Sequence, residues 1–254
     1  MPTYVLYRTL AAIQPADVIE VPYGQQGTNW LLPIEQLLAT NAAVTLIATP
    51  NSPTGHLVAM EDLRQLASGL SGVLVVDEAY VDFAGVGADM ASLALVREFE
   101  NVIVLRTLSK GYGLAGLRLG FGIAQPGLLA GLLKVKDSYN VDAIALKLGE
   151  AAITDQSYKN SCVQKIIAAR DELSNDLRKL GFKVWPSQAN FLLVQPPESQ
   201  SGPTAEKIYR ELKAQGIMIR YFAQPGLEDK LRITVGRTEQ NERMLKAIAE
   251  TFGL

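Results

Sequence analysis

The sequence predicts an α/β fold: a three-layer domain built on a mostly parallel sheet, followed by a smaller α+β domain. Up to about residue 125, short apolar runs of strand character alternate with segments of helical apolar spacing, which is typical of parallel sheets covered by helices. Beyond that point the pattern changes to long amphipathic helices and then to mixed strands and helices. We place the boundary between residues 155 and 156, which gives domains of residues 1–155 and 156–254.

The expected strands of the first domain are short and apolar, and helices are expected between them. Helical spacing of apolar residues covers residues 33–40 and 59–68, and Glu61 and Asp62 lie where acids favour the start of a helix. In such a sheet, ligands bind at the carboxyl ends of the strands. We expect strands at residues 17–22, 44–48, 73–77, 102–106 and 119–124.

The second part begins with helical segments whose Lys and Arg residues follow the exposed face. A stretch rich in Pro, Ser and Gly at residues 195–203 is the one segment with the composition of a linker. We expect helices at residues 127–137, 142–180, 204–215 and 239–252, and extended segments at 182–185, 190–194, 218–221 and 231–235.

The composition is that of an ordinary globular protein, with 254 residues, 48% hydrophobic and 20% charged, and a formal net charge of -2. This charge balance gives no reason to expect nucleic acid or a membrane as a partner. A single cysteine, Cys162, excludes an internal disulfide, and a single histidine, His56, argues against a zinc site. The start of the chain lacks a secretory signal pattern, so we expect a cytoplasmic protein without a bound metal.

Two polar clusters follow expected strands of the first domain. Residues 49–55, Thr-Pro-Asn-Ser-Pro-Thr-Gly, predict a tight turn that presents small polar side chains, and alone they indicate no more than a turn. Asp77 ends the next strand, and Tyr80 follows it three residues later. The acid could cap a helix, or it could hold a cationic ring nitrogen with Tyr80 directed at the same ligand.

The third cluster surrounds Lys110, which lies among hydroxyl groups and glycines at the end of a strand. Burial and neighbouring cations favour the neutral amine of a lysine, which attacks aldehydes. Thr107, Ser109 and Arg118 supply hydrogen-bond donors suited to a phosphate. The alternative is a surface loop with an unremarkable lysine.

The fourth cluster consists of two arginines in the last part of the chain. Arg220 directly follows the segment 216–219, and Arg232 lies inside the apolar strand 231–235. An arginine in such a strand needs an anionic partner. That partner could be a substrate, or an acid of the protein in a structural salt bridge.

The order of these clusters resembles that of the fold-type I aminotransferases, and among them the histidinol-phosphate aminotransferases. The matching motifs are Pro-Asn-x-Pro-Thr-Gly, Asp-Glu-Ala-Tyr, Thr-x-Ser-Lys with Gly-Leu-Ala-Gly-Leu-Arg, and Leu-Arg-Ile-Thr-Val-Gly. The resemblance runs from residue 2 to the last helix. It implies a pyridoxal 5′-phosphate (PLP) enzyme of histidine biosynthesis that transfers an amino group from a phosphorylated amino alcohol to 2-oxoglutarate. It also implies a homodimer.

The resemblance further implies a role for each matching residue. Lys110 would bind the cofactor as a Schiff base and then act as the base that moves the proton of the substrate's Cα. Asp77 would keep the pyridine nitrogen protonated, so that the ring serves as an electron sink. Tyr80 would donate to the phenolate oxygen of the cofactor, with Ser52 or Asn51 beside it. The remaining implied contacts are Tyr4 stacked on the ring, Thr107, Ser109 and Arg118 on the phosphate, and Arg220 and Arg232 on the anionic group of the substrate.

Two departures from the family pattern stand out. The family has Asn directly before Pro-Thr-Gly, whereas this chain has Ser52 there and Asn51 one residue earlier. Losing one neutral hydrogen bond costs about 0.5–1.5 kcal/mol, which predicts a modified site and not an inactive one. Family members also carry roughly one small domain's worth of chain ahead of residue 2. We therefore expect a large domain that is incomplete at its N-terminal side, and the activity of these residues alone stays open.

Three alternatives remain. Within the PLP class, the chain could be an aromatic aminotransferase or resemble a threonine-phosphate decarboxylase. It could also be a shortened paralogue without catalytic activity. Residues 111–116 match G-x-G-x-x-G, with Asp137 further on, which suggests an NAD-dependent oxidoreductase. That motif should open a helix, whereas residues 117–124 have the pattern of a strand, so this alternative is disfavoured.

Overall fold

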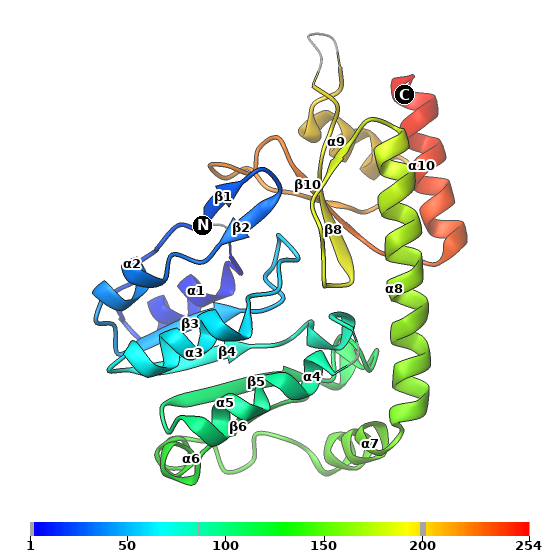
Figure 1. Ribbon diagram of the computed structural model, residues 1–254. Coiled ribbons are helices and arrows are strands. Elements are labelled where there is room, and N and C mark those ends of the chain that lie inside the picture. Colours follow the sequence, from blue (N-terminus) through cyan, green and yellow to red (C-terminus); the bar gives the residue numbers. More distant parts are fainter. Residues whose placement is uncertain (1–2, 86, 199–201, 254) are drawn as a thin grey trace.

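The computed structural model describes residues 3–85, 87–198 and 202–253. Figure 1 shows two sheets at opposite ends of the molecule, with the long helix α8 (Gln156–Lys179) running beside both. The first sheet belongs to the N-terminal part of the chain and the second to the C-terminal part. The expected α/β domain followed by a smaller α+β unit is therefore confirmed as a fold class.

The first sheet has the strand order β3-β4-β5-β6. Strands β3 (Val44–Ala48), β4 (Val73–Asp77) and β5 (Val102–Thr107) are parallel, and β6 (Gly120–Ala124) runs antiparallel to β5. Four of the five strands expected in this part form within a residue of their predicted bounds. Because β3, β4 and β5 are parallel, the loops after all three leave from the same edge of the sheet, the one formed by the carboxyl ends of these strands.

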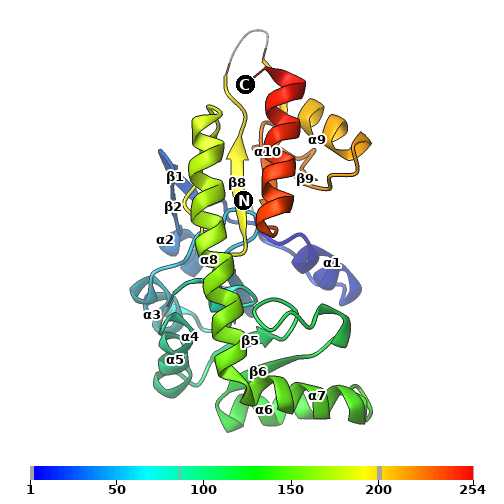
Figure 2. The same cartoon turned by 90° about the vertical axis from the view of Figure 1, so that its right-hand side faces the viewer.

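Helices cover both faces of the first sheet, as the predicted three layers require. Figure 2 shows α3 (Met60–Gly69) and α5 (Leu93–Glu98) on one side and α1 (Leu6–Ile13) on the other. Leu66 of α3 and Leu95 of α5 are fully buried against the sheet residues Leu74 and Val104. The short helices α2 (Ile34–Ala39), α4 (Ala88–Ala91) and α6 (Pro126–Leu133) complete this part.

The strand expected at residues 17–22 is wrong. This segment has no ladder partner in the described chain, and the nearby strands are the short hairpin β1 (Gly24–Gln26) and β2 (Asn29–Leu31). A strand forms only where a neighbour accepts and donates its backbone hydrogen bonds. The outer edge of β3 is also unpaired among the described residues, and its Val44 and Leu46 are 53% and 38% exposed.

The single helix expected at residues 142–180 is also wrong, because two helices form there. The first is α7 (Ala143–Thr154), and α8 begins after Asp155. Asp155 leaves the helical conformation, with φ −91° and ψ 64°, and its carboxylate accepts a hydrogen bond from the Tyr158 backbone N–H. An aspartate at this position caps the new helix and separates it from the preceding one.

The second sheet is antiparallel, with the order β7-β8-β10-β9. It is covered by α8, α9 (Ala205–Ala214) and α10 (Thr238–Phe252), whose apolar faces share one core with the sheet. The expected linker at residues 195–203 includes residues 199–201, which lie outside the described residues. The strands are β7 (Lys183–Val184), β8 (Phe191–Gln195), β9 (Arg220–Tyr221) and β10 (Leu231–Thr234).

Buried polar contacts from α8 connect the two parts of the molecule. The guanidinium group of Arg170 donates to the carbonyl oxygens of Phe83 and Ala189, at 3.1 and 3.0 Å. One turn after the start of α8, Lys159 forms a buried ion pair with Asp82 at 3.3 Å. Since α8 contacts both parts, the division between residues 155 and 156 stays a prediction.

Candidate active site

The candidate site lies at the edge of the first sheet where its parallel strands end. Asp77 is the last residue of β4, and it pairs in register with Ala48, the last residue of β3. Thr107 ends β5, and Lys110 follows three residues later. The turn at residues 49–55 leaves the same edge, and its Gly55 carbonyl accepts from the Gln188 backbone N–H at 2.8 Å. The second sheet is thereby held close to this edge.

Both oxygens of the Asp77 carboxylate accept hydrogen bonds. Oδ2 accepts from the hydroxyl of Tyr7 at 2.7 Å, and Oδ1 accepts from the backbone N–H of Ala79 at 3.1 Å. Both of these donors are neutral. Within the described part of the chain, the Asp77 carboxylate therefore has no ion-pair partner. The next acid, Glu78, is instead buried in an ion pair with Arg106 at 2.6 Å.

Tyr7 is a site residue that the sequence-based prediction missed. It lies on α1, and the ring of Tyr4 packs edge-on against it with centroids 5.7 Å apart. Burial raises the pKa of Tyr7, and the Asp77 carboxylate raises it further. The signal that could have identified it is the three-residue step from Tyr4. The Tyr7 backbone N–H donates to the Tyr4 carbonyl at 3.3 Å, so the turn that leads into α1 brings the two side chains together.

Lys110 and Tyr80 face each other. The Nζ atom of Lys110 lies 5.3 Å from the centre of the Tyr80 ring, and it has no hydrogen-bond or ion-pair partner in the described chain. The Tyr80 ring packs edge-on against Phe191 of β8, with centroids 5.1 Å apart. Burial raises the pKa of Tyr80, while the charge of Arg232 lowers it. The amine of Lys110 therefore lies beside the Tyr80 ring, and that ring in turn packs against Phe191 of the second sheet.

Arg232 reaches across from the second sheet to the Pro-Thr-Gly turn. Its Nη1 donates to the hydroxyl oxygen of Ser52 at 2.9 Å, and its guanidinium carbon lies 5.0 Å from the centre of the Phe191 ring. The Nε atom is buried, and no residue in the described part of the molecule accepts its hydrogen bond. Burial lowers the pKa of Arg232, and the nearby charge of Arg220 lowers it too.

Asn51 and Ser52 face different surroundings. The Nδ2 of Asn51 donates to the hydroxyl of Thr54, and its Oδ1 accepts from the hydroxyl of Thr3, both at 2.9 Å. Asn51 is 1% exposed. Its amide therefore stabilises the turn and the start of the chain, whereas Ser52 contacts the arginine of the second sheet.

Of the three residues expected to hold a phosphate, Thr107 and Ser109 lie together and Arg118 is directed elsewhere. The Thr107 hydroxyl accepts from the backbone N–H of Ser109 at 3.1 Å, so these two share one tight turn before Lys110. Arg118 has a left-handed backbone, with φ 55°, and its exposed guanidinium donates to the carbonyl of Ala115 at 2.8 Å. Arg118 is thus turned toward its own loop.

Tyr4 and Arg220 are exposed members of the predicted site. Tyr4 is 44% exposed at the start of the described chain, in contact with Tyr7. Arg220 pairs in register with Arg232 in the second sheet, and its guanidinium lies 5.7 Å from the Phe222 ring centre.

The glycine-rich segment 111–116 leads into a short 3-10 helix, Ala115–Leu117, and then into β6. It opens no α-helix, which removes the structural basis of the dinucleotide-binding alternative.

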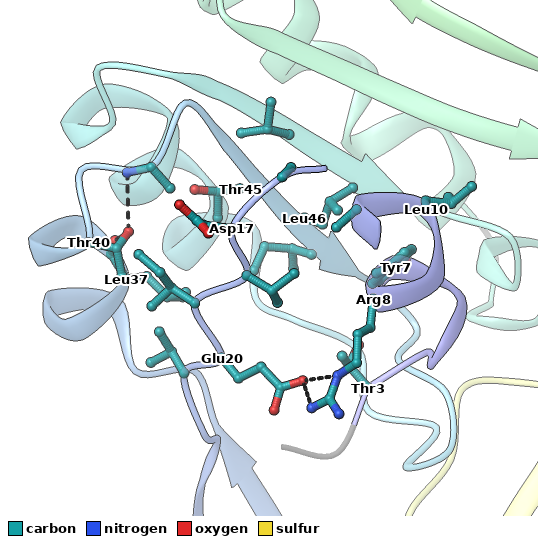
Figure 3. Close-up of a pocket in the computed structure, with 18 of the residues that line it drawn as sticks. Thr3, Tyr7, Arg8, Leu10, Asp17, Glu20, Leu37, Thr40, Thr45 and Leu46 are labelled. Atoms are coloured by element: carbon teal, nitrogen blue, oxygen red, sulfur yellow. Dashed lines mark hydrogen bonds and ion pairs between the residues drawn. The ribbon is translucent and has the colours of Figure 1, made fainter. Parts of the chain in front are cut away.

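A separate cavity of about 920 Å³ lies beside the site, between α1, α2, β3 and residues 16–21. Figure 3 shows Tyr7, Arg8 and Leu10 of α1 on one side of it and Leu37 and Thr40 on another. Lys110, Tyr80 and Arg232 do not line this cavity. Tyr7 is shared, because it lines the cavity and also donates to Asp77.

Two kinds of site are not found in the described chain. No helix there combines the length and the apolar character that crossing a membrane requires. No group of three or more metal-binding side chains gathers in that part of the molecule either.

Sequence comparisons identify similar proteins over nearly the whole chain. A family model described as aminotransferase class I and II matches residues 1–248. Histidinol-phosphate aminotransferase 1 of Trichormus variabilis is 61% identical over 250 residues, which cover 98% of this chain and 68% of that protein. The protein of the same name from Nostoc sp. is 60% identical with the same coverage. These relatives are therefore longer than this chain.

Solved structures show the same similarity. Histidinol-phosphate aminotransferase from Sinorhizobium meliloti, in complex with pyridoxal-5′-phosphate, superimposes with a TM-score of 0.87 at 28% identity. The match covers 98% of this chain and 67% of that one. L-threonine-O-3-phosphate decarboxylase from Porphyromonas gingivalis has a TM-score of 0.81 at 23% identity, covering 99% and 75% of the two chains. The second likeness shows a common fold alone.

Proposed function

We propose, on the premise that this chain belongs to the class I and II aminotransferase family, that it carries out PLP-dependent transamination between histidinol phosphate and 2-oxoglutarate. The observation that supports this most strongly is the position of Lys110. Its free amine lies 5.3 Å from the Tyr80 ring centre, at the same sheet edge as the Asp77 carboxylate. The choice of histidinol phosphate follows the names of the relatives at 61% and 60% identity.

The residues present fit PLP. A primary amine without a hydrogen-bond partner in the described chain can bind the cofactor's aldehyde. A carboxylate that accepts only from neutral donors has room for a cationic ring N–H. The Tyr80 hydroxyl and the Ser52 hydroxyl would donate to a phenolate oxygen, and Asn51 stabilises the turn that holds Ser52. When bound, PLP supplies an electron sink for the negative charge that develops on the substrate's Cα.

Lys110 would carry the proton transfer. With its amine free, the Nζ of Lys110 would be the base that takes the proton from the substrate's Cα. Asp77 would hold a proton on the ring nitrogen, because a partly buried negative charge favours the cationic form of its partner. Tyr80 stays protonated, since burial raises its pKa, and therefore remains a hydrogen-bond donor.

The anions of cofactor and substrate would be held by separate groups. We assign the cofactor's phosphate to Thr107, Ser109 and Arg118, with Arg118 turning away from the Ala115 carbonyl. Arg232 is the primary group for the substrate's anion, because its buried Nε has no acceptor in the described chain. Arg220 adds positive charge beside it, and Tyr4 would cover the ring of the cofactor.

Assembly and location are also proposals. We propose a cytoplasmic homodimer, with a PLP-binding domain of residues 1–155 and a small domain of residues 156–254. Ile144, Leu146 and Leu148 of α7 are 72%, 55% and 51% exposed. Exposed apolar side chains along one helix favour burial against a second copy.

The central test is covalent capture of the cofactor. The purified chain is mixed with PLP, the near-visible absorbance is recorded, and borohydride reduction is followed by peptide mass spectrometry. We expect a stable adduct on Lys110 and none in Lys110→Ala, with Lys134→Ala as the matched control. A folded chain that forms no adduct, or forms one on another lysine, overturns the proposal.

The substrate is tested with the same preparation. Histidinol phosphate with 2-oxoglutarate should give glutamate, whereas threonine phosphate should release no carbon dioxide and aromatic amino acids should react more slowly. Binding of PLP to Lys110 without turnover of any of these would favour the non-catalytic paralogue.

A further inference from the structure

We infer that Tyr7 is a positioning residue that fixes the Asp77 carboxylate in the orientation in which it receives the ring N–H of the cofactor. The inference rests on the proposed function, and it concerns a residue outside the motifs that indicate that function. The contact joins residues 70 positions apart in the sequence, and its donor–acceptor distance is 2.7 Å.

The geometry around Asp77 shows what the contact does. A carboxylate turns about its Cβ–Cγ bond unless both oxygens are held. Here the Ala79 backbone N–H holds Oδ1 and the Tyr7 hydroxyl holds Oδ2. An ionised carboxylate has about four acceptor positions, so two hydrogen bonds fix its plane and still leave room for a third donor. Tyr7 therefore does not need to move when the cofactor binds.

The chemical character of Tyr7 suits this role. Burial and the charge of Asp77 both raise the pKa of its phenol, so the proton stays on Tyr7 and the hydroxyl is always a donor. A lysine, arginine or histidine in the same place could carry a positive charge and would compete with the cationic ring for Asp77. A phenol orients the carboxylate without neutralising it.

The location of Tyr7 couples it to Tyr4. It lies on α1, and the ring of Tyr4, which comes just before that helix, packs edge-on against it, so the segment that would present Tyr4 to the cofactor also holds Asp77. Tyr7 also lines the neighbouring cavity between α1 and β3. A shift of α1 would therefore change the position of both residues together.

The test uses Tyr7→Phe, which keeps the ring and removes only the hydroxyl. We expect the affinity for PLP, measured by absorbance titration, to fall about 10-fold, because a hydrogen bond to a charged group is lost. The pH midpoint of the bound cofactor's absorbance should also move upward. A ring nitrogen that is less firmly protonated withdraws less charge, so the nitrogen that joins Lys110 to the cofactor becomes more basic.

Tyr23→Phe is the matched control, because Tyr23 is partly buried like Tyr7 but its ring faces His56 at 6.4 Å and not Asp77. This variant should leave both the affinity and the midpoint unchanged. A double-mutant cycle separates positioning from packing: in an Asp77→Asn background, Tyr7→Phe should change the affinity by less than about 2-fold. A purely structural role would give the same loss in both backgrounds.

A second readout needs no turnover. The chain is labelled with 3-fluorotyrosine, and the fluorine resonance of Tyr7 is assigned by its absence in Tyr7→Phe. It should shift when PLP is added, while that of Tyr23 should not. Unchanged or tighter PLP binding by Tyr7→Phe overturns the role of Tyr7, and tighter binding would mean that the hydroxyl blocks Asp77. A parent chain without a Lys110 adduct overturns the proposed function, and this role with it.

Discussion

Arg232 in β10 donates a hydrogen bond to the hydroxyl of Ser52, at 2.9 Å, although 180 positions separate the two residues. The contact joins the second sheet to the turn that follows β3. Ser52 therefore has a contact beyond the role expected of the asparagine that the family has at this position. The Ser52 oxygen accepts from the arginine, so its own proton is free to be donated to another oxygen. This geometry fits the proposal that Ser52 connects the arginine with an oxygen of a bound ligand.

We predict that Ser52→Ala weakens binding of an anionic substrate. The variant removes the acceptor for Nη1, and the Arg232 guanidinium then lies half-buried with two unpaired donors. The dissociation constant for 2-oxoglutarate, measured by spectral titration of the PLP-loaded chain, should rise about 2- to 10-fold. Ser68→Ala, which removes an exposed hydroxyl from α3, is the control and should have no effect. Equal affinities for both variants would show that Ser52 does not orient Arg232.

Lys159→Met should destabilise the folded chain strongly. Lys159 and Asp82 are 5% and 9% exposed at the side chain, and the substitution leaves a buried carboxylate without its ion-pair partner. Removing one partner of a buried pair costs about 3–5 kcal/mol. The free energy of unfolding from urea titration measures the loss.

Lys147→Met is the matched control for this prediction, because Lys147 forms an exposed ion pair with Glu150, at 80% and 65% exposure. Exposed pairs contribute about 0–1 kcal/mol. Similar losses in the two variants would show that the Lys159–Asp82 pair does not stabilise the junction between α8 and the first sheet.

Local sequence features were enough to predict most of the first sheet and its candidate residues. β3, β4 and β5 are apolar runs that pair with one another in parallel. Parallel order alone brings the ends of β4 and β5, with Asp77 and Lys110, to one edge. Predictions that depended on distant partners were less successful. The segment 17–22 has the composition of a strand, but nothing in the described chain pairs with it. The break at Asp155 needed knowledge of its capping bond to Tyr158.

The same distinction applies to the site. Lys110, Asp77 and Tyr80 belong to compact motifs, so sequence alone identified them as candidates. Tyr7 lies outside every motif, and only the tertiary position of α1 brings its hydroxyl to Asp77. The different surroundings of Asn51 and Ser52 also depend on tertiary contacts, with Thr3 and with Arg232.

Gly55→Ala should disrupt the contact between the Pro-Thr-Gly turn and the second sheet. Gly55 has φ +73°, and an added Cβ would lie 2.6 Å from Cβ of Ser187. The left-handed backbone alone costs a non-glycine residue about 1–2 kcal/mol, and the clash adds to this cost. Gly226→Ala is the control, because Gly226 has φ +81° with nothing near its missing Cβ. Thermal unfolding should show a clearly larger loss for Gly55→Ala, and equal losses would exclude a contribution from Ser187.

The single histidine gives a prediction about pH. Burial lowers the pKa of His56 from its ordinary value of 6.5, although the charge of Asp62 opposes this effect. Between the folded and unfolded pKa values, the unfolded chain binds more protons than the folded chain, so the free energy of unfolding falls as the pH drops below 6.5. The loss stops once the pH lies below the folded pKa, and above 6.5 the histidine makes no pH-dependent contribution.

His56→Gln isolates this contribution, because the carboxylates that also titrate in acid are the same in both proteins. The difference in the free energy of unfolding between parent and variant should be constant from about pH 7 to pH 8 and should shift against the parent toward about pH 5. Urea titrations at each pH measure it. A difference that does not change with pH would mean that His56 binds its proton equally well in both states. A difference that shifts in favour of the parent toward acid would mean that Asp62, and not burial, dominates its surroundings.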